Sequence, residues 1–422
     1  MHVVSVLADI AEHPFIYLAC VCLAGLIAVY VNYVFLGKYT CGIIYVQISF
    51  AFNAAVVLFG WHNGDVSTFR VLHFFSYEMI TVIGVYWVYT RILRSRARLF
   101  ESLQSVNVEM VSTLIILYNL AISLIEIKYV LGSGGASRIS YMEAPWFSYI
   151  RPVIFIFDPL SFLIPIYLLD RGKRLLPMLI LGTSVATNIL AGSKASFLYG
   201  VIIMLLFYED LKGARLAISK PLKALLIMVL SASALFALVR LNEGMTDMAA
   251  RLALTGESTI MLYYSDQPQA AAEGVSALAK IHRGVAKALG DSSAKDPDTL
   301  FGFALSRLEY GANTSTGPNS AIASYMLCNY SGWGNLIGLA CIVGYLVVIS
   351  LFYDLFILRR NRETSRILFV PFVVTSLYNF PQDYNHGMSD ITALCIYVLI
   401  AAWASAAVSA GQDERRRSYD AT

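Results

Sequence analysis

Continuous runs of apolar residues recur along this chain, each about as long as the roughly twenty residues that cross a bilayer as an α-helix. Polar and apolar positions do not alternate within the runs, which favours helices over the strands of a membrane barrel. The pattern predicts about eleven spans, or about twelve. They are expected near residues 15–36, 41–61, 71–90, 111–131, 152–169, 175–191, 195–208, 222–239, 333–358, 367–380 and 391–408.

Composition agrees with this pattern. Hydrophobic residues make up 58% of the chain and charged residues 14%, whereas soluble domains carry about 25% charged residues. The mean hydropathy is +0.64. These values exclude an ordinary soluble domain and predict an all-α polytopic membrane protein.

The basic residues predict the orientation of the spans. Lys and Arg gather in alternate connections, and such connections face the cytoplasm. The other connections are therefore expected outside, and an odd number of spans also leaves the amino terminus outside. The clusters are Arg91, Arg94, Arg96 and Arg98; Arg171, Lys173 and Arg174; Lys212, Arg215, Lys220 and Lys223; Arg359, Arg360, Arg362 and Arg366; and Arg415, Arg416 and Arg417.

One long polar stretch, residues 241–318, interrupts the apolar rhythm. We expect residues 1–240 to form the first eight spans and 241–318 to form a large outward loop with amphipathic helices. Residues 319–410 then re-enter the membrane as the last three spans, and residues 411–422 form a cytoplasmic tail. An Ala-rich segment in the loop carries Lys280, Arg283 and Lys287 on one helical face.

Several classes of site are not indicated. All six cysteines lie within or beside apolar runs, which suggests neither a disulfide framework nor a zinc site. The basic residues are explained by topology, so no nucleic-acid partner is expected. No motif calls for a cofactor or a metal.

Outward arginines are the strongest candidates for chemistry, because the guanidinium fork binds phosphate oxygens bidentately and stays charged. They are Arg240, Arg251, Arg283 and Arg307. The acidic residues of the same loop are their alternative partners.

Other acids fall within the expected spans, where charges are costly and mark candidate sites. Asp158 lies seven residues after Arg151, on the same helical face, so the two either form an ion pair or line a substrate groove. Glu78 is expected to face the bundle interior. Glu126 and Lys128 are expected to snorkel toward the outer interface.

Three segments carry a resemblance to a known family. They are ILAGSKASFLYGVIIMLLFYE, with a short Gly-Ser-basic turn between two helices; the long outer loop that begins at Arg240; and NTSTGPNSAIASYMLCNYSGWGNLIGL, a Gly-punctuated re-entry. In this layout the chain resembles the Wzy-type polymerases of O-antigen and capsular polysaccharide, which are related in architecture to the O-antigen ligases. The family usually has arginine in the Gly-Ser-basic turn, where this chain has Lys194.

The resemblance implies a GT-C-like glycosyltransferase of the bacterial inner membrane with its active site facing the periplasm. It would use neither nucleotide sugar nor metal. Its substrates would be oligosaccharide repeat units on undecaprenyl pyrophosphate, and its partners membrane lipids and a chain-length regulator.

Such a reaction needs a cradle for the pyrophosphate, a base for the acceptor hydroxyl and a groove for the substrates. The cradle would use Arg240, Arg251, Arg283 and Arg307 with support from Lys194. His282 is the first choice of base, because histidine titrates near neutral pH, followed by Glu309 and then His386. Arg151, Asp158, Tyr310, Asn313 and His386 would line the groove.

Two other functions stay open. An O-antigen ligase would share the architecture and the cradle but pass the glycan to a lipid A core sugar. A polysaccharide or lipid transporter would be favoured by paired polar residues at the bilayer midplane in corresponding positions of two halves, whereas the candidate polar residues here gather toward the outer face.

Overall fold

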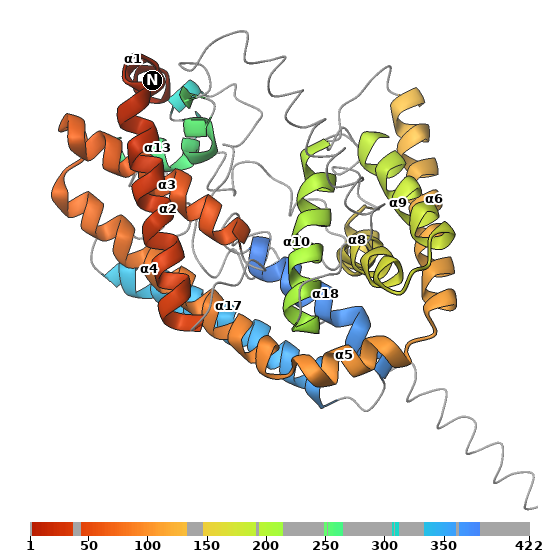
Figure 1. The fold of residues 1–422 in the computed structure, drawn as a ribbon. Helices are drawn as coiled ribbons and strands as arrows, with labels where there is room; N and C mark the ends of the chain where they lie inside the picture. Colours follow the sequence, from red (N-terminus) through yellow and green to blue (C-terminus); the bar gives the residue numbers. More distant parts are fainter. Residues whose placement is uncertain are drawn as a thin grey trace, which may run out of the picture.

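The structure is a computed structural model, and it describes residues 2–36, 44–132, 147–190, 194–213, 249–250, 252–264, 306–307, 309–311, 333–359 and 363–379. Within these ranges the chain is mostly helical and contains no strand (Figure 1). The main elements are α1 (His2–Glu12), α2 (Pro14–Leu36), α3 (Ile44–Asn63), α4 (Thr68–Arg94), α5 (Arg96–Ser105), α6 (Val108–Gly132), α8 (Phe147–Asp170), α9 (Leu175–Leu190), α10 (Lys194–Lys212), η2 (Leu254–Gly256), α13 (Glu257–Tyr263), α17 (Trp333–Phe352), η6 (Tyr353–Leu358) and α18 (Glu363–Asn379).

The helices follow the predicted spans. Each predicted span that falls on described residues coincides with a helix, while those near 222–239 and 391–408 lie outside these residues. By length and apolar composition, three described helices are able to cross a membrane, namely α2, α4 and α6. Large apolar side chains on their outer faces are exposed, such as Leu26 at 68% and Leu124 at 67%. The described fold is that expected of an all-α membrane protein.

Helices α2 and α3 pack closely against each other. Small residues allow this approach, because Ala24 and Ala28 on α2 and Ala51, Ala54 and Ala55 on α3 are all buried. Small side chains bring helix backbones near enough for extensive van der Waals contact, which is the usual basis of helix association in a bilayer. This pair and α4, which also contacts both helices, form one side of the molecule (Figure 1).

Helices α6, α8 and α9 form a second group, and polar residues join them. Asn119 on α6 donates hydrogen bonds from Nδ2 to Thr183 Oγ1 (3.1 Å) and Ser184 Oγ (3.0 Å) on α9. Ser123 and Thr187 share a further hydrogen bond of 2.9 Å. Interhelical hydrogen bonds of this kind are worth about 0.6–2 kcal/mol each in membranes.

The buried polar face of α6 shows that one prediction was wrong. Glu126 does not snorkel to an interface, because its side chain is only 2% exposed. The physical reason is its position in the helix, since Glu126 follows Asn119 and Ser123 at spacings of seven and three residues and therefore shares their buried face. Lys128 is exposed as expected, and Glu78 is 1% exposed, which confirms that it faces the interior.

The sequence did not predict helix α5, which follows α4 directly. Leu99 and Leu103 are buried one turn apart on this helix, whereas Arg96 and Arg98 are exposed. The apolar side contacts α10 and α18, and α5 thereby bridges the two helix groups at one end (Figure 1). We call this the basic end, defined by Arg91, Arg94, Arg96 and Arg98.

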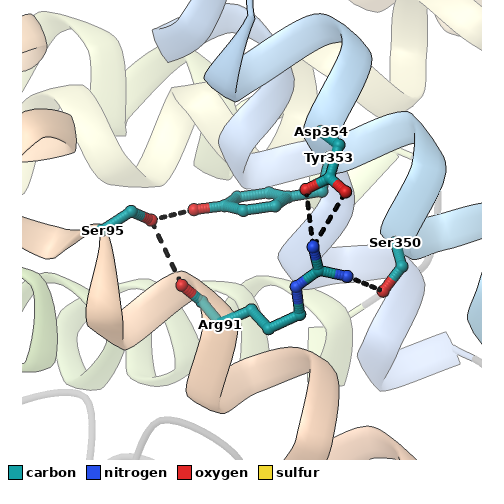
Figure 2. Close-up of polar contacts among 5 residues, drawn as sticks. All are labelled: Arg91, Ser95, Ser350, Tyr353 and Asp354. Atoms are coloured by element: carbon teal, nitrogen blue, oxygen red, sulfur yellow. Dashed lines mark hydrogen bonds and ion pairs between the residues drawn. The ribbon is translucent and has the colours of Figure 1, made fainter.

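An ion pair at the basic end ties α4 to η6, which directly follows α17 (Figure 2). Arg91 Nη2 donates to Asp354 Oδ1 (2.9 Å) and Oδ2 (2.8 Å), while its Nη1 donates to Ser350 Oγ (3.1 Å). Ser95 Oγ and the hydroxyl of Tyr353 form a second link. The helix is π-helical from Tyr353 to Leu358, immediately beside these contacts.

A second ion pair lies between α8 and α10. Lys212 Nζ lies 2.8 Å from both carboxylate oxygens of Asp170, and Tyr208 donates to the same carboxylate at 2.8 Å. Arg91 and Lys212, two of the basic residues from which the orientation was predicted, thus each pair with an acid on a neighbouring helix.

Candidate functional site

The described parts of the long polar loop lie at the opposite end of the helices, against α1, α3 and the start of α4 (Figure 1). We call this the outer end, after the orientation that the sequence predicts. Helix α13 is fixed there by hydrogen bonds to two helices: Tyr264 donates to the carbonyl of Val56 on α3 (2.8 Å), and Arg70 Nη1 on α4 donates to the carbonyl of Tyr263 (2.8 Å). Thr259 and Asn53 share another side-chain contact. The loop thus has a packed inner layer.

Glycine allows this layer to pack closely. A Cβ atom at Gly60 would lie 2.3 Å from the hydroxyl oxygen of Tyr264 and 2.6 Å from Val66 Cγ2. Residues Glu257 to Tyr263 are buried throughout. The absence of a side chain at Gly60 therefore allows α13 to contact α3.

Helix α1 was not predicted, although its pattern is amphipathic. Val3, Val6 and Ile10 recur at helical spacing and are buried. The helix contacts α13 and α2. Its first turn is held by the loop, because the backbone N–H of Val3 donates to Glu309 Oε1 at 2.7 Å.

Glu309, which the sequence analysis named as a candidate base, makes a structural contact with α1. Its side chain is 8% exposed, and one of its oxygens accepts from the first turn of α1. A carboxylate is favourable there, because unpaired N–H groups and the helix dipole make a helix N-terminus electropositive. Glu309 thus anchors α1 to the loop.

Tyr310, a predicted groove residue, meets an acid that the sequence analysis missed. Its hydroxyl donates to Glu257 Oε1 at 2.6 Å. Glu257 is 7% exposed, while Tyr310 is 47% exposed. Partial burial and the neighbouring Glu257 carboxylate raise the pKa of Tyr310 above its ordinary value of 10.0, so the phenol stays a neutral donor at physiological pH.

Arg307 belongs to the same short helical segment as Glu309 and Tyr310. The N–H of Gly311 donates to the carbonyl of Arg307 at 2.9 Å, and Gly311 has a φ of 99°, in the left-handed region that glycine favours. The side chain of Arg307 is half-buried, with Nε inaccessible to solvent. Arg307 thus lies two residues before Glu309, in the segment that Tyr310 joins to Glu257.

Arg70 and His73 are further residues that the sequence analysis missed. His73 is 8% exposed, its Nδ1 lies 3.1 Å from the Tyr263 hydroxyl, and its ring lies 4.7 Å from that of Tyr77. Arg70 lies on α4 one turn before His73, and its side chain is half-buried. An arginine in a connection that is predicted to face outward departs from the positive-inside pattern, and that signal could have identified Arg70.

The structure describes the other predicted site residues in part. The residues outside the described ranges are Arg240, Arg251, His282, Arg283, Asn313 and His386. Lys194 is the first residue of α10, and Arg151 lies in the first turns of α8; their side chains lie outside the described part of the structure.

Asp158 lies apart from the outer end, near the middle of α8. It is exposed, and its Oδ1 accepts from the hydroxyl of Tyr118 on α6 at 2.6 Å. The structure therefore places the predicted site residues that it describes in two regions, with Arg307, Glu309 and Tyr310 in one and Asp158 in the other.

The outer end gathers both basic and acidic side chains among the described residues. Arg70 and Arg307 supply guanidinium groups, His73 supplies an imidazole and Tyr310 supplies a hydroxyl, while Glu257 and Glu309 supply carboxylates. Among the described residues, no group of three or more His, Cys, Asp or Glu is placed to hold a metal ion. The chain matches no protein family, no curated protein and no solved structure.

Proposed function

We propose that this protein is a membrane-embedded glycosyltransferase that joins oligosaccharide repeat units carried on undecaprenyl pyrophosphate. It would be a GT-C-like protein of about eleven spans in the bacterial inner membrane, with its site on the periplasmic side. The observation that carries the proposal is the assembly at the outer end. There Tyr310 joins the segment of Arg307 and Glu309 to Glu257, and Arg70 and His73 on α4 both contact Tyr263.

The position of this assembly supports a reaction at the outer leaflet. It lies at the end of the helices opposite the basic end, where Arg91 and Arg94 belong to the predicted cytoplasmic connection. A substrate carried on a membrane lipid presents its pyrophosphate at the membrane surface, which is the level of a site on helix ends.

The reaction that fits is transfer of the growing glycan to a single repeat unit. An acceptor hydroxyl attacks the anomeric carbon of the donor, a base takes the hydroxyl proton, and the bond from that carbon to the pyrophosphate oxygen breaks. Undecaprenyl pyrophosphate leaves with the bonding electron pair. Negative charge grows on it during this step, so arginines already in place stabilise the transition state more than the ground state.

The described residues suggest a division of roles. Arg307 and Arg70 would face the pyrophosphate. His73 joins the candidate bases, because its Nδ1 is oriented by the Tyr263 hydroxyl and histidine transfers protons near neutral pH. Glu309 is a positioning residue in this scheme, since it holds α1 against the loop.

The test is a gel of surface and lipid-linked glycans from the native host after deletion and restoration of the gene. The proposal expects deletion to leave lipid A core capped with a single repeat unit, and restoration to return the ladder. Uncapped core together with long polymer on undecaprenyl pyrophosphate would indicate a ligase instead. An unchanged gel would overturn the glycosyltransferase proposal and favour a transporter.

A further inference from the structure

Helix α5 is held between two of the helices that are able to cross a membrane, α4 and α6. Only Ser95 separates it from the end of α4, and only Val106 and Asn107 separate it from the start of α6. Such short connections keep the 10-residue helix α5 at the ends of its two neighbours. Because α4 and α6 are spans in the account above, α5 lies at the level of the lipid headgroups.

Exposed cations of two connections gather around the end of α10. A Cβ atom at Gly213, the residue after α10, would lie 3.2 Å from the guanidinium carbon of Arg96. Phe100 on α5 lies near Tyr208 on α10, with ring centroids 6.2 Å apart, and Tyr208 donates to Asp170 at the end of α8. The turn that follows Asp170 is therefore close to α5. We call the exposed cations of the two connections the cation patch: Arg94, Arg96, Arg98, Arg171, Lys173 and Arg174.

The cation patch carries positive charge that no acid of the described residues neutralises. Asp170, the acid that directly precedes the patch residues after α8, is paired with Lys212. Within the part of the chain that the structure describes, none of the six patch residues forms an ion pair. Two exposed acids follow in the chain, Glu101 on α5 and Glu109 in the first turn of α6. The six cations therefore outnumber the exposed acids of this region.

The level of the patch selects its ligand. Guanidinium groups bind phosphate oxygens bidentately, and clusters of Lys and Arg beside a spanning helix attract acidic lipids. Zwitterionic headgroups carry a cation that offsets their phosphate, so an excess of positive charge favours acidic headgroups. Orientation of the spans requires basic residues in a connection, but it does not require that two connections bring them together around one helix end and leave them without acid partners.

We propose that the cation patch binds the headgroups of acidic phospholipids in the leaflet that it faces. This inference uses no part of the proposed reaction. A headgroup bound between α5 and the turn after α8 links the two connections through a lipid phosphate, in addition to the contacts that α5 makes with α10 and α18.

The experiment is native mass spectrometry of the full chain in a neutral detergent, titrated with equal amounts of phosphatidylglycerol and phosphatidylcholine. Arg98→Glu and Arg174→Glu each reverse one charge of the patch, on different connections. Both positions lie at the start of a helix, α5 and α9 respectively, where an acid is favourable, so both variants are expected to fold. Lys128→Glu is the matched control, because Lys128 is exposed and lies near the far end of α6.

Wild-type protein is expected to prefer phosphatidylglycerol over phosphatidylcholine by about fivefold or more. Arg98→Glu and Arg174→Glu should each lower this preference about fivefold, the size expected for one cation near an acidic lipid surface. Lys128→Glu should keep the wild-type preference. This pattern would support the cation patch as the lipid site.

Three results would overturn the proposal. Equal binding of the two lipids by wild-type protein would show that the patch does not select acidic headgroups. A wild-type preference that persists in both Arg98→Glu and Arg174→Glu would place the lipid elsewhere. Displacement of phosphatidylglycerol by an equal amount of inorganic phosphate would show that the site takes a free anion instead of a lipid headgroup. Each of these results leaves the glycan-gel result unaffected.

Discussion

Tyr310 donates a 2.6 Å hydrogen bond to Glu257, a residue 53 positions earlier in the chain. This bond joins the two described parts of the long loop, and neither sequence neighbourhood indicates it. Together with the bond from the Val3 N–H to Glu309, it links the loop, α13 and the amino-terminal helix into one layer at the outer end.

Tyr310→Phe removes this link and is expected to loosen the loop. A hydrogen bond to a charged group is worth about 1.5–3 kcal/mol, and the lower part of that range applies because Tyr310 is partly exposed. The measurement is limited proteolysis or amide exchange of the outer loop in nanodiscs. Tyr30→Phe is the control, since Tyr30 lies on α2 and is 67% exposed; equal protection of the loop in both variants would contradict the role of the bond.

The same bond predicts a pH dependence. The pKa of Tyr310 is raised in the folded protein by burial and by Glu257, above a value of 10.0. A raised pKa means that the folded state favours the protonated phenol, so its contribution is complete below pH 10 and is lost as pH rises through the higher folded pKa. The difference in loop protection between wild type and Tyr310→Phe should therefore be constant from pH 7 to 9 and shrink above 10. A difference that already shrinks below pH 9 would contradict this.

Gly60→Ala tests the packing of α13 on α3. The new methyl group would lie 2.3 Å from the Tyr264 hydroxyl oxygen, which is held by the carbonyl of Val56. Overpacking of this kind costs about 1–3 kcal/mol, and the thermal midpoint in detergent should fall. Gly25→Ala is the matched control, because nothing lies within 4 Å of a Cβ there. A midpoint shift of the same size in both variants would mean that the α3 contact is not responsible.

Arg91→Ala is expected to destabilise the link between α4 and α17 (Figure 2). The side chains of Arg91 and Asp354 are 33% and 25% exposed, so loss of the pair should cost about 1–2 kcal/mol, between the values for exposed and buried pairs. Denaturant titration measures this cost. Arg94→Ala, at an exposed position of the same helix, should have little effect, and the swap of Arg91→Asp with Asp354→Arg should restore part of the loss. If the double variant lost as much stability as the two single variants together, Arg91 and Asp354 would not form a direct pair.

Hydrophobic runs were sufficient to predict the long helices that the structure describes, because a run of apolar residues is a local signal. The orientation predicted from Lys and Arg stays a prediction. Helices α1 and α5 are short and amphipathic, and a search for long apolar runs passes over them. The prediction that Glu126 reaches the interface was wrong, because Glu126 shares a buried helix face with Asn119 although it lies near the helix end. The pairings of Tyr310 with Glu257 and of Arg70 with Tyr263 depend on how distant segments pack, and no spacing in the sequence encodes them.

The most direct measurement is the reaction itself with purified protein in nanodiscs. Wild-type protein, given only repeat units linked to undecaprenyl pyrophosphate, is expected to produce a ladder of longer lipid-linked glycans and to release undecaprenyl pyrophosphate. Arg307→Ala should lower the rate at least a hundredfold, the loss typical of one group that stabilises developing charge, while the protein stays folded. A wild-type protein that yields no ladder, or an Arg307→Ala protein that polymerises at the wild-type rate, would contradict the proposed chemistry.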